Sequence, residues 1–297
     1  MKSISVVIPS YKSWAFIGKC LEALDRELSR DQDEVIVVDS SGQAAPDELR
    51  RKFARVQWEL RPQRLYPGAA RNIGFQKSRH DWIAFVDSDV VVQEGWRLAI
   101  EQFPGHLAAG GGPVDPGNPE TRWGSARYWI EFGQFHAANL PHAAWNIPSC
   151  NMLWKRSEFE NTGGFPEDCR SADDLLFNYR NMKLRGRCYT LAPQMRVTHP
   201  ASGDRVAARL HLRQVGYWSG RARRQGVKPA IPASMVMLPL LFLYRYARVC
   251  RRYIRGSRSG NEQSLLWLIA KGTLWWCLGF FEGMRSAESA SMPEPRE

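Results

Sequence analysis

The chain has 297 residues, enough for one large α/β domain with an appended segment, and its 44% hydrophobic and 24% charged content is ordinary for a globular protein. Its six cysteines form no C-x-x-C pair, which argues against a small disulfide-stapled secreted fold. The net charge is +11, but residues 221–297 alone contain 13 Lys and Arg against 5 Asp and Glu. A nucleic-acid enzyme more often carries its basic residues around a cleft. We therefore expect no nucleic-acid partner, and instead contact with an anionic membrane surface.

Short apolar segments alternate with segments of helical spacing along the first two-thirds of the chain. Strands are predicted over residues 4–8, 34–39, 56–60, 83–86, 151–154 and 188–191, and helices over 16–28, 46–53, 68–75, 172–180 and 209–224. This alternation, with fully apolar strands, is typical of a mostly parallel, Rossmann-like sheet with helices on both faces. Residues 104–150, rich in Gly, Pro and aromatic side chains, are interpreted as a strand followed by long loops that wall a substrate site.

Three polar or turn-forming residues stand where predicted strands end. Pro9 ends the first strand, Asp39 the second and Asp87 the strand over 83–86. Ligands in α/β sheets bind beyond the carboxyl ends of the strands. We therefore expect these three residues to converge in space.

The sequence Asp87-Ser88-Asp89 follows a buried strand directly. Carboxylates at positions i and i+2 of an extended chain point the same way and could approach one hard cation. At sites of phosphate chemistry, Mg²⁺ is usually held by one or two carboxylates together with substrate phosphates. The same residues could instead form an Asx turn that closes the strand.

Six stretches, in this order, resemble glycosyltransferase family 2, whose members have the GT-A fold. They are SVVIPSY at 5–11, VIVVD at 35–39, GAARNIG at 68–74, DSD at 87–89, NTGGF at 161–165 and DD at 173–174. Together they cover residues 3–200. The resemblance is specific because the stretches occur in the family's order and in the matching strand or helix context.

The resemblance implies a donor-binding site, position by position. Asp39 would accept a hydrogen bond from the donor nucleobase, and the backbone near Pro9 and Tyr11 would line the nucleoside pocket. Arg71 would lie near the diphosphate, unless it is an ordinary arginine on a helix surface. Asp87 would approach the ribose and a metal ion.

The resemblance also implies metal-binding and catalytic residues. Asp89 would be the principal ligand of Mn²⁺ or Mg²⁺, and His199 could be a further metal ligand, a diphosphate contact or a turn residue before Pro200. Asp174 would be the catalytic base, at the position of the family's Glu-Asp pair. Because the pair here is Asp-Asp, Asp173 could take that role instead. Both could also be ordinary acids in the first turn of a helix.

The expected reaction is a metal-dependent, inverting transfer. One carboxylate would deprotonate the acceptor hydroxyl as it attacks the anomeric carbon, and the metal would neutralise charge on the departing nucleoside diphosphate. We expect a nucleoside-diphosphate sugar, foremost a UDP-sugar, and a glycan or polyprenyl-linked acceptor in cell-envelope polysaccharide or glycolipid synthesis. Gln214 and Trp218 match the Q-x-x-R-W motif of processive members, but Tyr217 replaces its arginine, which favours a non-processive enzyme.

The main alternative is a non-catalytic sugar-nucleotide or glycan-binding protein on the same fold. Loss of Asp89 or of the acid pair would have favoured it, and both are present. A nucleotidyltransferase would need a Gly-rich loop with Arg and Lys after the first strand, where this chain has Pro-Ser-Tyr-Lys at 9–12.

The domain prediction assigns residues 1–225 to the glycosyltransferase domain, 226–285 to a helical membrane-associating region and 286–297 to a disordered tail. Residues 230–244 are uncharged but hold two prolines and are too short for a straight spanning helix. Residues 265–281, which include Lys271, Gly272 and Gly279, could embed in the membrane interface, re-enter it or pack on a neighbouring helix.

Residues 245–258 are predicted to form a two-faced helix. On a helical wheel one face carries arginines and the other apolar residues, as in helices that lie on a membrane. The arginines are Arg245, Arg248, Arg251, Arg252, Arg255 and Arg258. The alternative is a helix docked on the catalytic domain. We expect the protein to lie on the cytoplasmic face of the inner membrane, peripherally or shallowly embedded.

Overall fold

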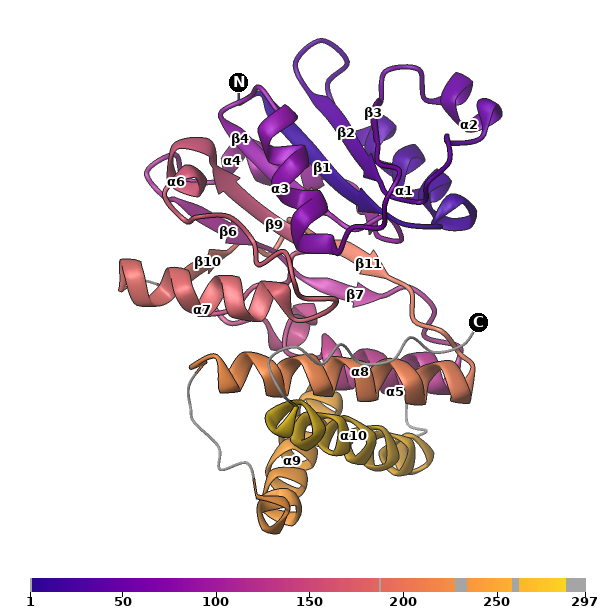
Figure 1. Cartoon of the computed structure of the whole chain (residues 1–297), viewed down its shortest axis with the longest axis vertical. Coiled ribbons are helices and arrows are strands. Elements are labelled where there is room, and N and C mark those ends of the chain that lie inside the picture. Colours follow the sequence, from indigo (N-terminus) through magenta and orange to yellow (C-terminus); the bar gives the residue numbers. More distant parts are fainter. Residues whose placement is uncertain (1, 187, 228–233, 258–261, 287–297) are drawn as a thin grey trace. The chain divides into compact units, whose positions relative to one another are not determined.

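The computed structural model describes residues 2–186, 188–227, 234–257 and 262–286, in two compact units. Unit 1 comprises Met1–Asp115 and Leu140–His199, and unit 2 comprises Pro116–Asn139 and Pro200–Glu297 (Figure 1). This division differs from the boundary predicted at residue 225, because residues 116–139 and 200–225 pack with the C-terminal helices. Of the predicted disordered tail, all but Ser286 lies outside the described residues.

Unit 1 is built on an eight-stranded sheet of order β3-β2-β1-β4-β9-β6-β10-β8. The strands are β1 (Ile4–Ser10), β2 (Glu34–Asp39), β3 (Gln57–Leu60), β4 (Trp82–Val86), β6 (Ala109–Gly111), β8 (Ala143–Ala144), β9 (Asn151–Lys155) and β10 (Tyr189–Leu191). The four strands β3, β2, β1 and β4 are parallel, as predicted, but β9 runs antiparallel to both β4 and β6. The sheet is therefore mixed rather than mostly parallel. Its apolar residues alone do not encode strand direction, and β9 does not follow a simple βαβ crossover.

Helices cover both faces of this sheet, as predicted (Figure 1). They are α1 (Trp14–Glu27), α2 (Asp47–Lys52), α3 (Pro67–Lys77), α4 (Trp96–Gln102), α6 (Arg156–Glu160) and α7 (Asp173–Arg185). Helix α3 approaches β1 so closely that a Cβ on Gly74 would lie 2.2 Å from Cγ1 of Val7. A second, three-stranded sheet has the order β5 (Val91–Val92), β11 (Val197–His199) and β7 (Val114–Pro116).

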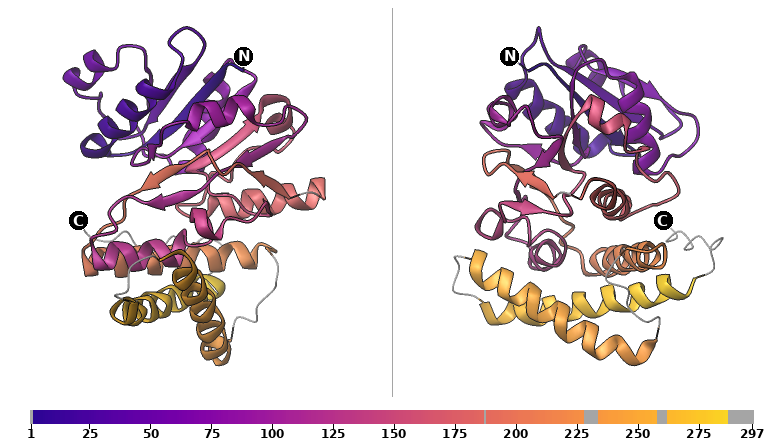
Figure 2. Two further views of the ribbon diagram at one scale, coloured as in Figure 1. Left: turned by 180° about the vertical axis from the view of Figure 1, so that it is seen from behind. Right: turned by 90° about the vertical axis from the view of Figure 1, so that its left-hand side faces the viewer.

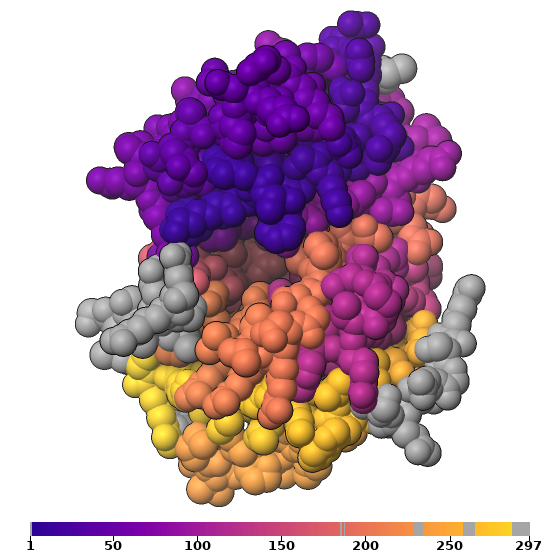
Figure 3. All heavy atoms as spheres, turned by 90° about the vertical axis from the view of Figure 1, so that its right-hand side faces the viewer, coloured from indigo at the N-terminus to yellow at the C-terminus, as the bar shows by residue number. Residues whose placement is uncertain are grey.

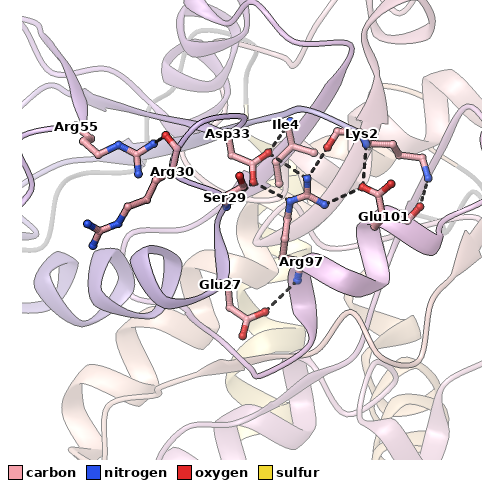
Figure 4. Close-up of polar contacts among 9 residues, drawn as sticks. All are labelled: Lys2, Ile4, Glu27, Ser29, Arg30, Asp33, Arg55, Arg97 and Glu101. Atoms are coloured by element: carbon pink, nitrogen blue, oxygen red, sulfur yellow. Dashed lines mark hydrogen bonds and ion pairs between the residues drawn. The ribbon is translucent and has the colours of Figure 1, made fainter.

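A buried network of charged groups fixes the amino end of the sheet, opposite the strand ends that carry the predicted site (Figure 4). Arg97 of α4 donates from Nε to Asp33 at 2.8 Å and from Nη1 to Glu101 at 3.2 Å. Asp33 also accepts the backbone N–H of Ile4 at 3.1 Å, and Arg97 donates to the carbonyl oxygen of Lys2. This network ties α4 to the first residues of β1 and to the residue that precedes β2.

We expect Arg97→Met to lower the free energy of unfolding by about 3–5 kcal/mol, because it leaves the fully buried carboxylate of Asp33 without its cation. Denaturant titration would measure the change. The matched control is Arg79→Met, which removes an exposed arginine from its ion pair with Glu34 and should cost less than about 1 kcal/mol. An equal decrease in the free energy of unfolding of the two variants would show that the buried ion pair of Arg97 contributes no more than the exposed pair of Arg79.

Unit 2 consists of helices drawn from two separate parts of the chain. They are α5 (Arg122–Glu131), α8 (Arg205–Arg224), α9 (Leu238–Gly256) and α10 (Glu262–Arg285), with short 3-10 turns η1 (Ala137–Asn139) and η2 (Met235–Met237). In Figure 3, the magenta atoms of α5 lie beside the orange atoms of α8. Nε2 of His211 in α8 lies 2.9 Å from a carboxylate oxygen of Glu131 in α5. The prediction of loops after the strand in residues 104–150 is therefore wrong for α5. Its buried residues surround the helix instead of following a single apolar stripe, because its partners come from far along the chain.

Helix α10 lies between α8 and α9 (Figure 2). A Cβ on Gly216 of α8 would lie 2.0 Å from the carbonyl oxygen of Trp276, and one on Gly279 of α10 would lie 2.0 Å from that of Arg213. Glycine is therefore required for this close approach, and of the three alternatives for residues 265–281 the structure shows packing on a neighbour. By length and composition Leu265–Arg285 could cross a membrane, but 56% of its apolar window is buried inside the unit. Its apolar character is thus weak support for a membrane span.

Helix α9 presents only part of its predicted arginine face to solvent, because Arg245 and Arg252 are partly buried. Arg245 lies over the ring of Trp276 at 3.6 Å and donates to the carbonyl oxygen of Ile130, while Arg252 donates to Gln134 at 3.1 Å. Burial lowers the pKa of both guanidinium groups to about 10. Arg248, Arg251 and Arg255 are exposed, and Arg258 lies outside the described residues. Because part of its surface packs on α5 and α10, α9 is in large part a docked helix.

Candidate active site

The carboxyl ends of β1 and β2 meet at Asp39. Ser10 Oγ donates to Asp39 Oδ2 at 2.5 Å, and the backbone N–H of Ser41 donates to Oδ1 at 2.9 Å. The side chain of Asp39 is buried, and Pro9 pairs with Val38 in the sheet. Of the three residues predicted to converge, Pro9 and Asp39 therefore lie at adjacent strand ends, and Asp87 follows β4, which pairs with β1 on its other side. Ser10 and Ser41 were not predicted, although both lie within the turns that follow these strands.

The turn after β1 holds Tyr11 beside a cationic side chain. Lys12 has a left-handed backbone with φ of 51°, and its N–H donates to Ser41 Oγ at 2.7 Å. The guanidinium of Arg64 lies 4.4 Å from the ring centroid of Tyr11. The arrangement is a half-buried aromatic ring near the fixed carboxylate of Asp39. Arg64 was not predicted, because it lies in a loop with no motif.

Arg71 is a buried residue and not a helix-surface arginine, so that alternative is excluded. Its Nη2 donates to Asp87 Oδ1 at 2.5 Å and its Nη1 donates to Asp173 Oδ2 at 2.7 Å. Its guanidinium also lies 5.4 Å from the ring centroid of Phe165. One guanidinium from α3 thus joins the carboxylate that follows β4 to the carboxylate that begins α7.

The two acids of α7 have different environments. Asp173 is paired with Arg71, whereas Asp174 accepts the backbone N–H of Ser149 at 3.3 Å and that of Leu175 at 2.7 Å. Burial and the neighbouring carboxylate of Asp173 raise the pKa of Asp174 to about 7. The preceding residue, Ala172, has a left-handed backbone with φ of 58°, so the chain turns sharply into the helix. Burial also raises the pKa of Asp173, although the cation of Arg71 opposes that shift.

Asp87 and Asp89 do not lie on extended chain, so the geometric premise for a shared cation is wrong. The N–H of Val90 donates to the carbonyl oxygen of Asp87 at 3.1 Å, which closes a turn. The Asp87 carboxylate meets Arg71, and the Asp89 carboxylate lies 3.7 Å from Nε2 of His199. Antiparallel pairing of β5 with β11 brings His199 to this position.

Among the residues that the structure describes, no group of three or more His, Cys, Asp or Glu side chains is arranged to hold a metal ion. Asp89 and His199 nevertheless offer one carboxylate and one imidazole close together, and the Asp89 side chain is 37% exposed. A small divalent cation commonly takes one or two protein ligands and fills its other positions with water and phosphate oxygens. These residues therefore fit Mn²⁺ or Mg²⁺ brought together with a diphosphate.

Asn151, at the start of β9, supports the segment that leads to His199. Its amide donates to the carbonyl oxygens of Met195 at 2.7 Å and Pro113 at 3.1 Å, and its oxygen accepts from the indole of Trp96 at 3.1 Å. The residue is completely buried. An asparagine that heads an otherwise apolar strand was the only sequence signal for this role.

Comparisons with known proteins agree with this arrangement. The sequence model of glycosyl transferase family 2 matches residues 5–162. Pre-mycofactocin glycosyltransferase of Mycobacterium tuberculosis is 29% identical over 199 residues, which are 63% of this chain and 40% of that protein. Glycosyltransferase AglE of Haloferax volcanii is 25% identical over 207 residues, 67% of each chain. The match thus covers less than half of the length of the mycobacterial relative.

Solved structures share the fold. The mannosyltransferase PcManGT from Pyrobaculum calidifontis, in complex with GDP-Man and Mn²⁺, matches 94% of this chain and 87% of its own with a TM-score of 0.61 at 15% identity. GalNAc-T7 with UDP, GalNAc and Mn²⁺ matches 80% of this chain and 53% of its own, with a TM-score of 0.52 at 13% identity. These matches confirm the predicted GT-A-like α/β fold. The family model matches residues 5–162, which is more than half of the chain, so the chain belongs to glycosyl transferase family 2.

Proposed function

We propose that this protein is an inverting, non-processive glycosyltransferase that uses a nucleoside-diphosphate sugar. The observation that carries the proposal is the charged cluster at the ends of the strands. Arg71 holds Asp87 and Asp173, while Asp174 lies beside them without a direct arginine partner and with a pKa of about 7. A sugar-binding protein would gain nothing from a carboxyl group with this pKa, whereas a general base works best near the operating pH.

In the proposed reaction Asp174 takes the proton of the acceptor hydroxyl. The acceptor oxygen forms a bond to the anomeric carbon as the bond from that carbon to the diphosphate oxygen breaks, and the nucleoside diphosphate leaves with the electron pair. Asp173 suits the base role less well, because its carboxylate is ion-paired with Arg71 at 2.7 Å. Arg71 would then hold the acidic residues in place and lie close to the diphosphate.

The donor nucleobase would be recognised at Asp39, as the resemblance implies. This carboxylate already accepts hydrogen bonds from Ser10 and Ser41, so its orientation is set before the donor arrives. A fixed carboxylate is suited to an imide N–H such as that of uracil, which supports a UDP-sugar as the first donor to test. Tyr11 and the backbone near Pro9 would line the nucleoside pocket.

Asp89 and His199 would hold Mn²⁺ or Mg²⁺ together with the donor phosphates. When bound, such an ion would neutralise charge on the leaving diphosphate. Asp87 is the weaker of the predicted ligands, because one of its carboxylate oxygens already accepts from Arg71. The role of the protein residues here is to orient the diphosphate so that the anomeric carbon faces Asp174.

For the acceptor and the cellular location we propose a glycan or polyprenyl-linked acceptor of envelope synthesis, reached from the cytoplasmic face of the inner membrane. The support is the excess of basic residues after residue 220 and the exposed apolar side chains of α9. Both features belong to unit 2, whereas the residues proposed for the transfer reaction belong to unit 1.

The test is a thermal-shift screen of the full chain with UDP-, GDP- and dTDP-sugars, with and without Mn²⁺. A ligand at 100 times its dissociation constant stabilises the folded state by about 2.7 kcal/mol. We expect one donor class to stabilise the protein in a Mn²⁺-dependent way and then to be slowly hydrolysed. Stabilisation without any turnover, even with offered acceptors, would favour the binding-protein alternative. No stabilisation by any donor would contradict the proposal.

A further inference from the structure

The outward side of α9 and η2 carries large apolar side chains in contact with solvent. Val236 is 82% exposed, and Leu240, Leu243, Tyr244 and Ile254 are 56–61% exposed. Residues of this size are seldom exposed together on one helix face, and a group of them marks a site of interaction. The opposite side of α9 is fully engaged, with Val249 and Tyr253 in the core of unit 2.

Exposed arginines flank these apolar residues on one side. At 3.6 residues per turn, Leu240, Leu243, Ala247 and Ile254 fall within an arc of about 60°, and Arg248, Arg251 and Arg255 fall within the next arc of about 60°. All seven residues are exposed. Leu238–Gly256 contains no Asp or Glu. The surface formed by these seven residues and Tyr244 is here named the outer face of α9.

We propose that the outer face of α9 docks on an anionic lipid bilayer. Leu240, Leu243 and Ile254 enter the boundary between headgroups and acyl chains, and the three arginines pair with lipid phosphates. Helices with an apolar side and flanking arginines lie in this way in the plane of the interface. The inference deepens the proposed membrane location and rests on it. It does not depend on the transfer reaction.

The charge pattern favours a bilayer over a second copy of the chain. In a twofold-symmetric dimer the same surface meets itself, so the three arginines of one copy would face the same positive surface on the other. No acidic residue of α9 is present to neutralise them. An anionic bilayer offers both partners at once, an apolar layer for the leucines and phosphates for the arginines.

The helix is also held ready for such a contact. On its inner side Arg245 stacks on Trp276 and Arg252 donates to Gln134, so α9 is fixed before it meets a membrane. A preformed surface avoids the entropy cost of ordering a segment on binding. Arg248 donates to the hydroxyl of Tyr244 at 2.7 Å, which places one guanidinium beside an aromatic ring of the kind enriched at membrane interfaces.

The test is flotation of the full-length protein with vesicles of phosphatidylcholine alone or with added phosphatidylglycerol. We expect binding to the anionic vesicles only. The combined change Arg248→Gln, Arg251→Gln and Arg255→Gln should weaken binding by about 10- to 100-fold, since each basic residue near such a surface contributes and salt screens part of it. Leu240→Glu with Leu243→Glu should weaken binding at least as much.

Control variants carry changes of the same kind at exposed residues of other helices. They are Leu98→Glu with Val206→Glu, and Arg50→Gln with Arg51→Gln. These should bind vesicles as the unchanged protein does, and all variants should keep its donor-induced thermal shift, which separates this proposal from the proposed transfer. The proposal is overturned if the unchanged protein ignores anionic vesicles, or if the controls lose as much binding. It is also overturned if the leucine variants only dissolve an oligomer, which would assign the outer face of α9 to a second copy.

Discussion

Asp174→Asn is expected to lower the turnover number by about 10²-fold or more while leaving donor affinity nearly unchanged. The asparagine amide cannot take the proton from the hydroxyl of the acceptor substrate, but the side chain keeps its size and its place beside Ser149. Steady-state rates and a separate donor titration would measure the two quantities. Asp173→Asn is the informative comparison, because it breaks the ion pair with Arg71 and should weaken donor binding as well. If Asp173→Asn alone abolished turnover and Asp174→Asn were mild, the two acids would have the opposite roles.

The pH dependence of turnover is expected to follow the protonation of Asp174. A base with a pKa of about 7 is active when deprotonated, so turnover should rise with pH and level off above neutrality.

The folded-state pKa of Asp174 lies above its ordinary value of 3.8, so this group stabilises the fold most at low pH. That contribution is lost as the pH rises from about 4 through 7. Asp174→Asn should therefore be more stable than the unchanged protein at pH 8, by on the order of 1–3 kcal/mol, and lose this advantage at low pH.

Asp89→Ala is expected to abolish Mn²⁺-dependent donor binding and to reduce transfer by about 10³-fold or more. A bound cation supplies several kcal/mol of stabilisation to a developing negative charge, and each 1.36 kcal/mol is tenfold in rate. The side chain is 37% exposed, so the fold should survive. Donor binding titrated against Mn²⁺ by calorimetry gives a measurement independent of turnover.

Further variants test whether Asp89 and His199 bind the metal ion. His199→Gln should weaken Mn²⁺-dependent binding less than Asp89→Ala, because it removes a neutral ligand rather than a charge. Glu94→Ala, which changes an exposed acid five residues after Asp89 in the sequence, should have no effect. Activity that persists unchanged in EDTA would exclude a role for Asp89 as a metal ligand.

The N-terminal half of the sheet could be predicted because its sequence is locally consistent. Residues 4–8, 34–39 and 83–86 are apolar throughout and end in turn-forming or acidic residues, so both the strands and the edge that carries Asp39 follow from the pattern. The direction of β9 could not be predicted in this way. Its apolar run pairs equally well with parallel or antiparallel neighbours, and the choice depends on residues far away in the chain.

The environments of the site residues were harder to predict than their identities. Arg71, Asp87 and Asp173 were each predicted separately, but 102 residues separate Arg71 from Asp173, and only the folded chain shows one guanidinium between both acids. The same limit applies to α9. The helical wheel groups Arg245 with Arg248, yet Trp276 lies over the first and not the second, and the wheel holds no information about where α10 packs.

The interleaved make-up of unit 2 has a consequence for the order in which the protein is synthesised. Trp123 of α5 stacks on Trp275 of α10 with ring centroids 4.9 Å apart, and Trp129 packs against Tyr253 of α9. At about 5–20 residues per second, α5 leaves the ribosome roughly 7–30 s before α10. All residues of unit 1 have been synthesised once the chain reaches His199, so this unit can complete its sheet before the partners of the aromatic side chains of α5 exist. A nascent chain stalled before α10 would therefore expose these aromatic rings although all of unit 1 had been synthesised, and would be a target for chaperones.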